Sequence, residues 1–126
     1  MTRKTNLELA QALLDWNRTH LKSDVTLSES LIGDRFASRF VVKANGRMYE
    51  ANHASYLAFL NGFKSTIASI DYEVRQSVAD GASAVLAMRA VVTRVDGRID
   101  RFDAMLLLQF DDAGKLALWH EVYVQV

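Results

Sequence analysis

The chain has 126 residues, of which 50% are hydrophobic and 24% are charged, and this length and composition predict one soluble globular domain. Its 15 basic residues balance 15 acidic ones, so no overall charge favours binding to nucleic acid or to a membrane surface. The sequence contains no cysteine, which excludes disulfides, thiolate metal sites and a cysteine nucleophile.

No targeting segment is expected. The first residues, MTRKTNLELAQALLDW, turn polar too soon for a signal peptide, and no apolar run approaches ~18 residues, the length of a membrane span. We therefore expect a cytoplasmic protein.

The first predicted element is a helix from about Leu7 to Leu21. Thr5 and Glu8 have the spacing of a capping box, and apolar side chains repeat along one face. Asn17 falls in the middle of that apolar face. Because an unpaired buried amide costs about 1–3 kcal/mol, Asn17 is expected either to hydrogen bond a loop or to point into a ligand pocket.

A short helix, a hairpin and a second long helix are predicted next. Asn45-Gly46 is typical of a hairpin turn, and Asn52 is placed to cap the second helix. The predicted ranges are Ser28–Ile32 for the short helix, Arg35–Lys43 and Arg47–Glu50 for the hairpin, and His53 to about Ala68 for the long helix.

From Ile70 onward the hydrophobic period is two, which predicts an antiparallel meander of four strands. Their ranges are Ile70–Val78, Ala82–Val95, Arg98–Asp111 and Lys115–Val126. Both faces of the middle pair are largely apolar, so something must cover each face.

The pairing of the middle strands depends on the Asp96-Gly97 turn. A two-residue turn would place Arg89 on one face with Ala104 and Leu106, the face that the helices are expected to cover. The other face would then carry Leu86, Met88, Met105 and Leu107. We expect that face to form a homodimer, with Arg101 and Asp103 at its rim.

The order of these elements, the segment NGRMYEANHASYLAFL and the ending LLLQFDDAGKLALWHEVYVQV resemble the SnoaL-like branch of the nuclear transport factor 2-like superfamily. That branch includes polyketide cyclases and ketosteroid isomerases. The resemblance covers essentially the whole chain, residues 1–126. It implies an α+β domain in which a curved antiparallel sheet wraps around helices to form a cone with an internal pocket.

The catalytic set of ketosteroid isomerase is missing from this chain. The position of its aspartate base falls on Arg39 or Phe40, and the position of its oxyanion-binding acid falls on Leu106. The tyrosine position in the first helix holds Trp16.

His120 and Glu121, neighbours in the segment LWHEVY, are the candidate catalytic residues, since imidazole and carboxyl groups transfer protons near neutral pH. A type I turn with a bulge at Gly114 would place His120 beside Leu106 on the pocket side. A longer loop would place Trp119, Glu121 and Tyr123 there instead. The sequence leaves both arrangements open.

Other residues are candidates for ligand binding. Arg89, flanked by Ala87 and Val91, is expected either to bind a carboxylate or enolate oxygen, or to turn outward or pair with an acid. On the resemblance, the aromatic residues are expected to line the pocket together with Leu106. They are Trp16, Tyr56, Phe59, Phe63, Trp119 and Tyr123. Three scattered histidines and the lack of a phosphate-binding loop predict neither a metal nor a cofactor.

Two functions are predicted. The first is a pocket protein for a hydrophobic small molecule, with cofactor-free isomerase, cyclase or dehydratase activity by general acid–base catalysis. The second is a non-catalytic dimeric interaction domain of the same fold.

Overall fold

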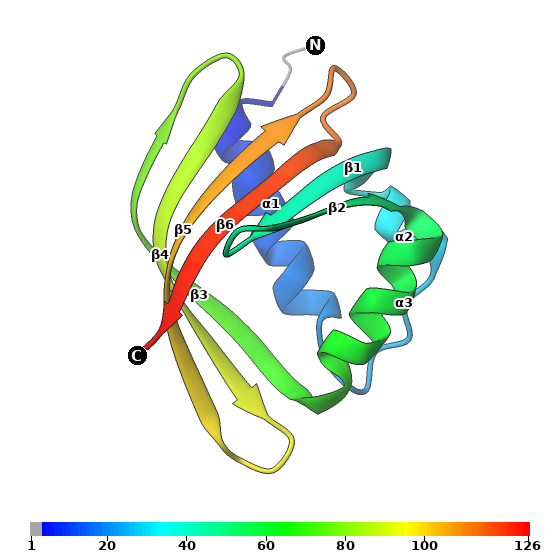
Figure 1. The fold of residues 1–126 in the computed structure, drawn as a ribbon, viewed down its shortest axis with the longest axis vertical. Coiled ribbons are helices and arrows are strands. Elements are labelled where there is room, and N and C mark those ends of the chain that lie inside the picture. The colour runs from blue at the N-terminus through cyan, green and yellow to red at the C-terminus, as the bar shows by residue number, and fades with distance from the viewer. Residues whose placement is uncertain (1–3) are drawn as a thin grey trace.

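The computed structural model describes residues 4–126 and shows the predicted α+β architecture, a curved and unclosed sheet with helices on its concave side (Figure 1). The helices are α1 (Asn6–His20), α2 (Glu29–Gly33), α3 (His53–Phe63) and the short 3-10 helix η1 (Lys64–Thr66). The strands are β1 (Phe36–Ala44), β2 (Arg47–Asn52), β3 (Ile67–Ala79), β4 (Ser83–Arg94), β5 (Ile99–Phe110) and β6 (Leu116–Gln125).

The strand order across the sheet is β2-β1-β6-β5-β4-β3. All neighbours are antiparallel except β1 and β6, which run parallel. The predicted meander therefore forms four consecutive strands, and the β1–β2 hairpin extends the sheet beyond β6. Within residues 4–126, no helix is both long and apolar enough to cross a membrane.

Local sequence signals explain where two helices begin. At α1, the Glu8 amide donates to Thr5 Oγ1 at 3.2 Å and the Thr5 amide donates to Glu8 Oε1 at 3.1 Å, which is the predicted capping box. Asn52 caps α3 by accepting a hydrogen bond from the Ser55 amide at 2.8 Å. However, α3 ends at Phe63 rather than near Ala68, because β3 begins at Ile67 and its pairing with β4 overrides the helical pattern.

The core lies between α1 and the concave face of the sheet. Leu13 and Leu14 of α1 are 1% exposed, and Leu86, Leu106 and Leu108 of the sheet are at most 1% exposed. Removing these side chains from water is the main source of the fold's stability.

The predicted pairing of β4 with β5 is wrong by one residue. The connection has three residues rather than two, since the Arg94 amide donates to the Arg98 carbonyl at 2.7 Å and Gly97 adopts a φ of 90°. Leu86 therefore pairs with Leu106, and Arg89 pairs with Asp103. A shift of one residue moves every side chain of a strand to the other face.

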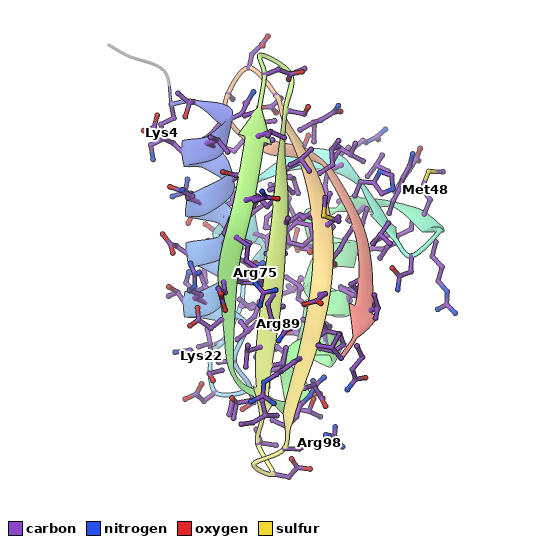
Figure 2. All side chains as sticks on the ribbon, turned by 90° about the vertical axis from the view of Figure 1, so that its left-hand side faces the viewer. Lys4, Lys22, Met48, Arg75, Arg89 and Arg98 are labelled. Carbon is purple, nitrogen blue, oxygen red and sulfur yellow. The ribbon has the colours of Figure 1, made fainter. Side chains whose placement is uncertain are left out.

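This register corrects the composition of the predicted association face. Leu86 and Met88 lie in the core, only 1% and 3% exposed, instead of on the outer face. Met105 and Leu107 do lie on the outer face, in register with Ala87 and Val85. In Figure 2 this face is turned toward the viewer, with Arg75 and Arg89 labelled on it.

The last hairpin combines the predicted turn with a bulge that the sequence did not reveal. The Asp111 amide donates to the Lys115 carbonyl at 2.8 Å, and Gly114 adopts a φ of 77°. Phe110 then pairs with Leu116, but Gln109 pairs with Leu118, which leaves Ala117 as an extra residue. The bulge brings Glu121 opposite Leu106 and His120 opposite Leu107.

Candidate functional site

A cavity of about 310 Å³ lies on the concave side of the sheet, bounded by side chains from α1, α3 and five strands. Most of its wall is aromatic or aliphatic, with the aromatic side chains Tyr56, Phe59, Phe63, Phe102, Trp119 and Tyr123. Four further side chains, Asn17, Tyr72, Arg94 and Glu121, supply polar groups to the same wall. An apolar cavity with a few converging polar groups is typical of a small-molecule site.

Glu121 is the carboxyl group of this wall. It lies on β6 between Leu106 of β5 and Ala44 of β1. Burial raises the pKa of Glu121, and hydrogen bonding to the Trp119 side chain offsets part of that rise. A carboxyl group with a raised pKa is a stronger base when ionised and keeps its proton to a higher pH, and both properties suit proton transfer.

Tyr72 provides a hydroxyl donor held by Asn17. The Asn17 Nδ2 group donates to the Tyr72 hydroxyl oxygen at 3.1 Å, so the buried amide of α1 has a partner. Burial also raises the pKa of Tyr72, which keeps the phenol protonated. Within residues 4–126 its O–H group has no acceptor, so it can donate to an oxygen of a bound ligand.

Arg18 fixes the position of Tyr72 from the rim of α1. Its Nη2 group donates to the Tyr72 carbonyl at 2.9 Å, and its Nε group donates to Asp71 Oδ1 at 2.7 Å. The guanidinium carbon also lies 5.5 Å from the centroid of the Tyr72 ring. Arg18 thus contacts both the backbone and the ring of Tyr72 and restricts the orientation of the phenol.

Five of the predicted site residues line the cavity, and the bulge at Ala117 explains why three of them do. They are Asn17, Tyr56, Trp119, Glu121 and Tyr123. Of the two arrangements left open for β6, the structure therefore has the one that turns Trp119, Glu121 and Tyr123 inward. Phe59 and Phe63 of α3 also line the cavity, as predicted.

Four predicted site residues lie elsewhere. His120 is on the outer face of the sheet because of the same bulge. Arg89 is also on the outer face, where its Nε group donates to Asp103 Oδ1 at 2.9 Å. Leu106 is fully buried in the core, and Trp16 packs in the core with its ring 5.5 Å from that of Phe36.

Sequence reasoning missed Tyr72 and Arg94. Both follow the period of two along inward-facing positions, Tyr72 after Ile70 and Arg94 after Ala90 and Val92. The period was visible in the sequence, but the incorrect register of β4 assigned its even-numbered residues to the outer face.

A second depression, of about 250 Å³, lies at the other end of α1. Charged side chains and a loop form much of its wall, and Lys115 already donates to the carbonyls of Gly33 and Asp34, each at 2.9 Å. It is a weaker candidate for a ligand site because its wall lacks the aromatic lining of the first cavity and Lys115 is already bonded to the backbone.

The curved open sheet, the three α-helices and the internal cavity define the class: the chain has the nuclear transport factor 2-like fold. Three solved structures have a TM-score of 0.74 to this chain. One is an LEH-like epoxide hydrolase from M. tuberculosis, with 14% identity over 98% of this chain and 83% of the other.

The second is a SnoaL-like polyketide cyclase candidate from Shewanella denitrificans, with 14% identity over 96% of this chain and 90% of the other. The third is an NTF2-like protein from Anabaena variabilis, with 11% identity over 98% and 94%. At the level of sequence, no protein-family model and no curated protein matches the chain. The likeness therefore establishes the fold.

Proposed function

We propose that the cavity binds a hydrophobic carbonyl compound and that Glu121 moves a proton at the carbon next to the carbonyl. The observation that carries the proposal is a partly buried carboxyl group, whose pKa burial raises, on the same apolar wall as a phenol donor. The structural neighbours described as a polyketide cyclase and an epoxide hydrolase support chemistry of the isomerase or cyclase type.

The proposed reaction begins with ionised Glu121 taking a proton from the α-carbon. The electron pair of the C–H bond moves into the carbonyl, which becomes an enolate oxygen. Tyr72 donates its hydroxyl hydrogen bond to that oxygen, and the Asn17 amide polarises the Tyr72 hydroxyl. Protonated Glu121 then returns the proton to another carbon in an isomerisation. In a cyclisation, the enolate carbon instead attacks a second carbonyl of the same molecule, the C=O bond opens to an alkoxide, and protonated Glu121 gives its proton to that oxygen.

Deuterium exchange tests the first step without knowledge of the natural substrate. A small hydrophobic ketone, 2-tetralone, is incubated in D₂O with the protein, and loss of its α-proton signals is followed by NMR. We expect exchange faster than in buffer, and a loss of about 10²-fold or more of the added rate in Glu121→Gln. The His120→Gln variant is the matched control and is expected to keep the rate.

Two results would contradict the proposal. One is exchange no faster than in buffer, and the other is equal exchange by the natural protein and Glu121→Gln. Tyr72→Phe separates the two roles, because it removes the oxygen-binding donor and leaves the base in place.

We also propose that the outer face of the sheet binds a second copy of the chain. Met105 and Val122 form a cross-strand pair on this face and are 54% and 57% exposed, and Val124 beside them is 59% exposed. Exposed apolar clusters of this kind mark interfaces. The Arg89–Asp103 ion pair beside them offers both charges to a symmetric partner.

Sedimentation equilibrium tests this association. We expect a dimer at micromolar concentration, and a monomer for Val122→Asp, because a buried unpaired carboxylate opposes association. A monomeric natural protein would refute the dimer. The alternative function, a non-catalytic interaction domain, gains support if the dimer forms and neither ketone exchange nor dye binding in the cavity is found.

A further inference from the structure

We propose that the ligand carries an anionic group bound by Arg94, remote from the carbonyl at Glu121, so that the substrates are elongated hydrophobic carboxylates or similar anions. The inference rests on the proposed function, because it concerns the other end of the same cavity. It follows from three features of the wall: the free donors of Arg94, its distance from Glu121 and the aromatic surfaces between them.

Arg94 is the cationic group of the cavity wall. It extends from the inward face of β4, two residues beyond Val92 and four beyond Ala90, which also line the cavity. Glu121 is the carboxyl-bearing side chain of the same wall. The cavity thus contains one acid and one base on a largely apolar surface.

The guanidinium of Arg94 is held in place but is only partly used. Its Nε group donates to Asp100 Oδ2 at 2.8 Å, and its Nη1 group donates to Thr66 Oγ1 at 3.0 Å. Within residues 4–126 its Nη2 group has no acceptor, although the side chain is only 19% exposed. A fixed guanidinium with free N–H groups is well suited to bind a carboxylate.

Asp100 does not neutralise the positive charge around Arg94. Asp100 pairs with Arg94 and also lies 3.6 Å from Arg98, so two guanidinium groups share one carboxylate. Arg98 is 65% exposed at the end of the β4–β5 hairpin, where Figure 2 labels it. With two guanidinium groups and one carboxylate, this cluster keeps an excess positive charge, and Arg94 is the more buried of its two cations.

Glu121 and Arg94 lie toward opposite ends of the cavity. Glu121 is in register with Leu106, and Leu106 is in register with Leu86, eight residues along β4 from Arg94. Eight residues of extended strand span at most about 26 Å, and sheet curvature and the reach of both side chains shorten that gap. Because the two groups lie eight residues apart in register along the sheet, a ligand that meets both is expected to be elongated.

Aromatic rings offer surfaces for the apolar body of such a ligand. On α3, Phe59 and Phe63 stack with centroids 5.8 Å apart and are 48% and 43% exposed. On the sheet, Phe102 and Tyr123 pack edge to face at 5.7 Å. All four line the cavity, so an apolar chain or fused ring system can contact both walls and cover side chains that are otherwise open to water.

A pair of dyes that differ by one charged group tests the inference. The probes are 1-anilinonaphthalene-8-sulfonate and its neutral analogue N-phenyl-1-naphthylamine, which share their aromatic rings. Their dissociation constants are measured by fluorescence titration with the purified full chain. We expect the natural protein to bind the sulfonate about fivefold to tenfold more tightly than the neutral dye, and the preference to weaken in high salt.

Arg94→Gln is expected to remove the preference while leaving the affinity for the neutral dye within about twofold. Arg89→Gln is the matched control, because Arg89 lies on the same strand and also pairs with an aspartate, but on the outer face. The double variant Arg94→Gln/Asp100→Asn removes both charges, so the test survives if the single variant is unstable. Circular dichroism checks that each variant is folded.

The outcomes separate the two proposals. If both dyes bind equally, or if Arg94→Gln keeps the preference, the anion site is refuted and the cavity remains. If Arg89→Gln removes the preference, the dye binds the outer face and the anion site is again refuted. If neither dye binds, the cavity does not accept hydrophobic ligands, and both the proposed function and this inference are refuted.

Discussion

Replacement of Glu121 by glutamine should change how stability depends on pH, and the direction of the change follows from burial. Glutamine keeps the size of the side chain and removes its charge. Burial raises the folded-state pKa of Glu121 above the ordinary value of 4.5, so the folded protein binds this proton more tightly than the unfolded chain does. The stability that the group contributes is therefore fully present below pH 4.5 and is lost as the pH rises through the folded-state pKa.

The size of the effect comes from proton linkage. Between the unfolded and folded pKa values, the free energy of unfolding falls by up to about 1.4 kcal/mol per pH unit relative to a variant without the group. We expect the difference between the natural protein and Glu121→Gln to decline over this window and then level off. Urea unfolding monitored by circular dichroism between pH 3 and pH 8.5 measures both curves.

Asp71→Asn is an internal comparison of opposite sign. The hydrogen bond from Arg18 lowers the pKa of Asp71, so its contribution is present above the ordinary value of 3.8 and is lost as the pH falls through the lowered pKa. A difference curve for Glu121→Gln that is flat, or that rises with pH, would refute the argument that burial perturbs this carboxyl group.

Three further substitutions test the fold by thermal and urea unfolding. Gly114→Ala should lower the free energy of unfolding by about 1–2 kcal/mol, since Gly114 has a φ of 77° and the new Cβ would lie 3.3 Å from Leu9 Cδ2. Gly62→Ala, in a helix with open space around it, should instead raise it by about 0.5–1 kcal/mol. Equal effects of the two variants would contradict the argument that the positive φ of Gly114 requires glycine. Leu106→Ala should cost about 3–5 kcal/mol through the core cavity that it creates, and a cost below 1 kcal/mol would place Leu106 outside the packed core. Thr5→Ala should cost about 1 kcal/mol by removing the cap of α1, and an unchanged midpoint would show that the capping box adds nothing measurable.

Much of the fold was predictable because its signals are local. Thr5 with Glu8, Asn45 with Gly46, and the change from a helical period to a period of two at β3 each depend on a few neighbouring residues. These features gave the order of elements and the superfamily resemblance, and the structural neighbours confirm the resemblance at the level of fold.

The faces of the strands were less predictable because they depend on single residues in turns and bulges. One more residue than expected at the Asp96-Gly97 turn reversed the faces of β4 relative to β5. At Ala117, an apolar residue in an apolar strand gives no sequence signal for a bulge. Consequently Asn17, Tyr56 and Glu121 were identified as site residues, whereas Tyr72 and Arg94 required the structure.

The bulge at Ala117 determines which face of β6 points into the cavity. Without the bulge, the strand can slide by one residue and turn Val122 and Val124 inward with His120, which would satisfy the hydrophobic pattern almost as well. Asn45 opposes that slip from the turn of another hairpin. Its amide donates to the Glu121 carbonyl at 3.0 Å, and its side chain donates to the Tyr123 carbonyl and accepts from the Tyr123 amide at 3.1 and 2.8 Å. Asn45 directly follows Ala44, which lines the cavity, so this turn asparagine helps to fix which ionisable side chain of β6 the cavity contains.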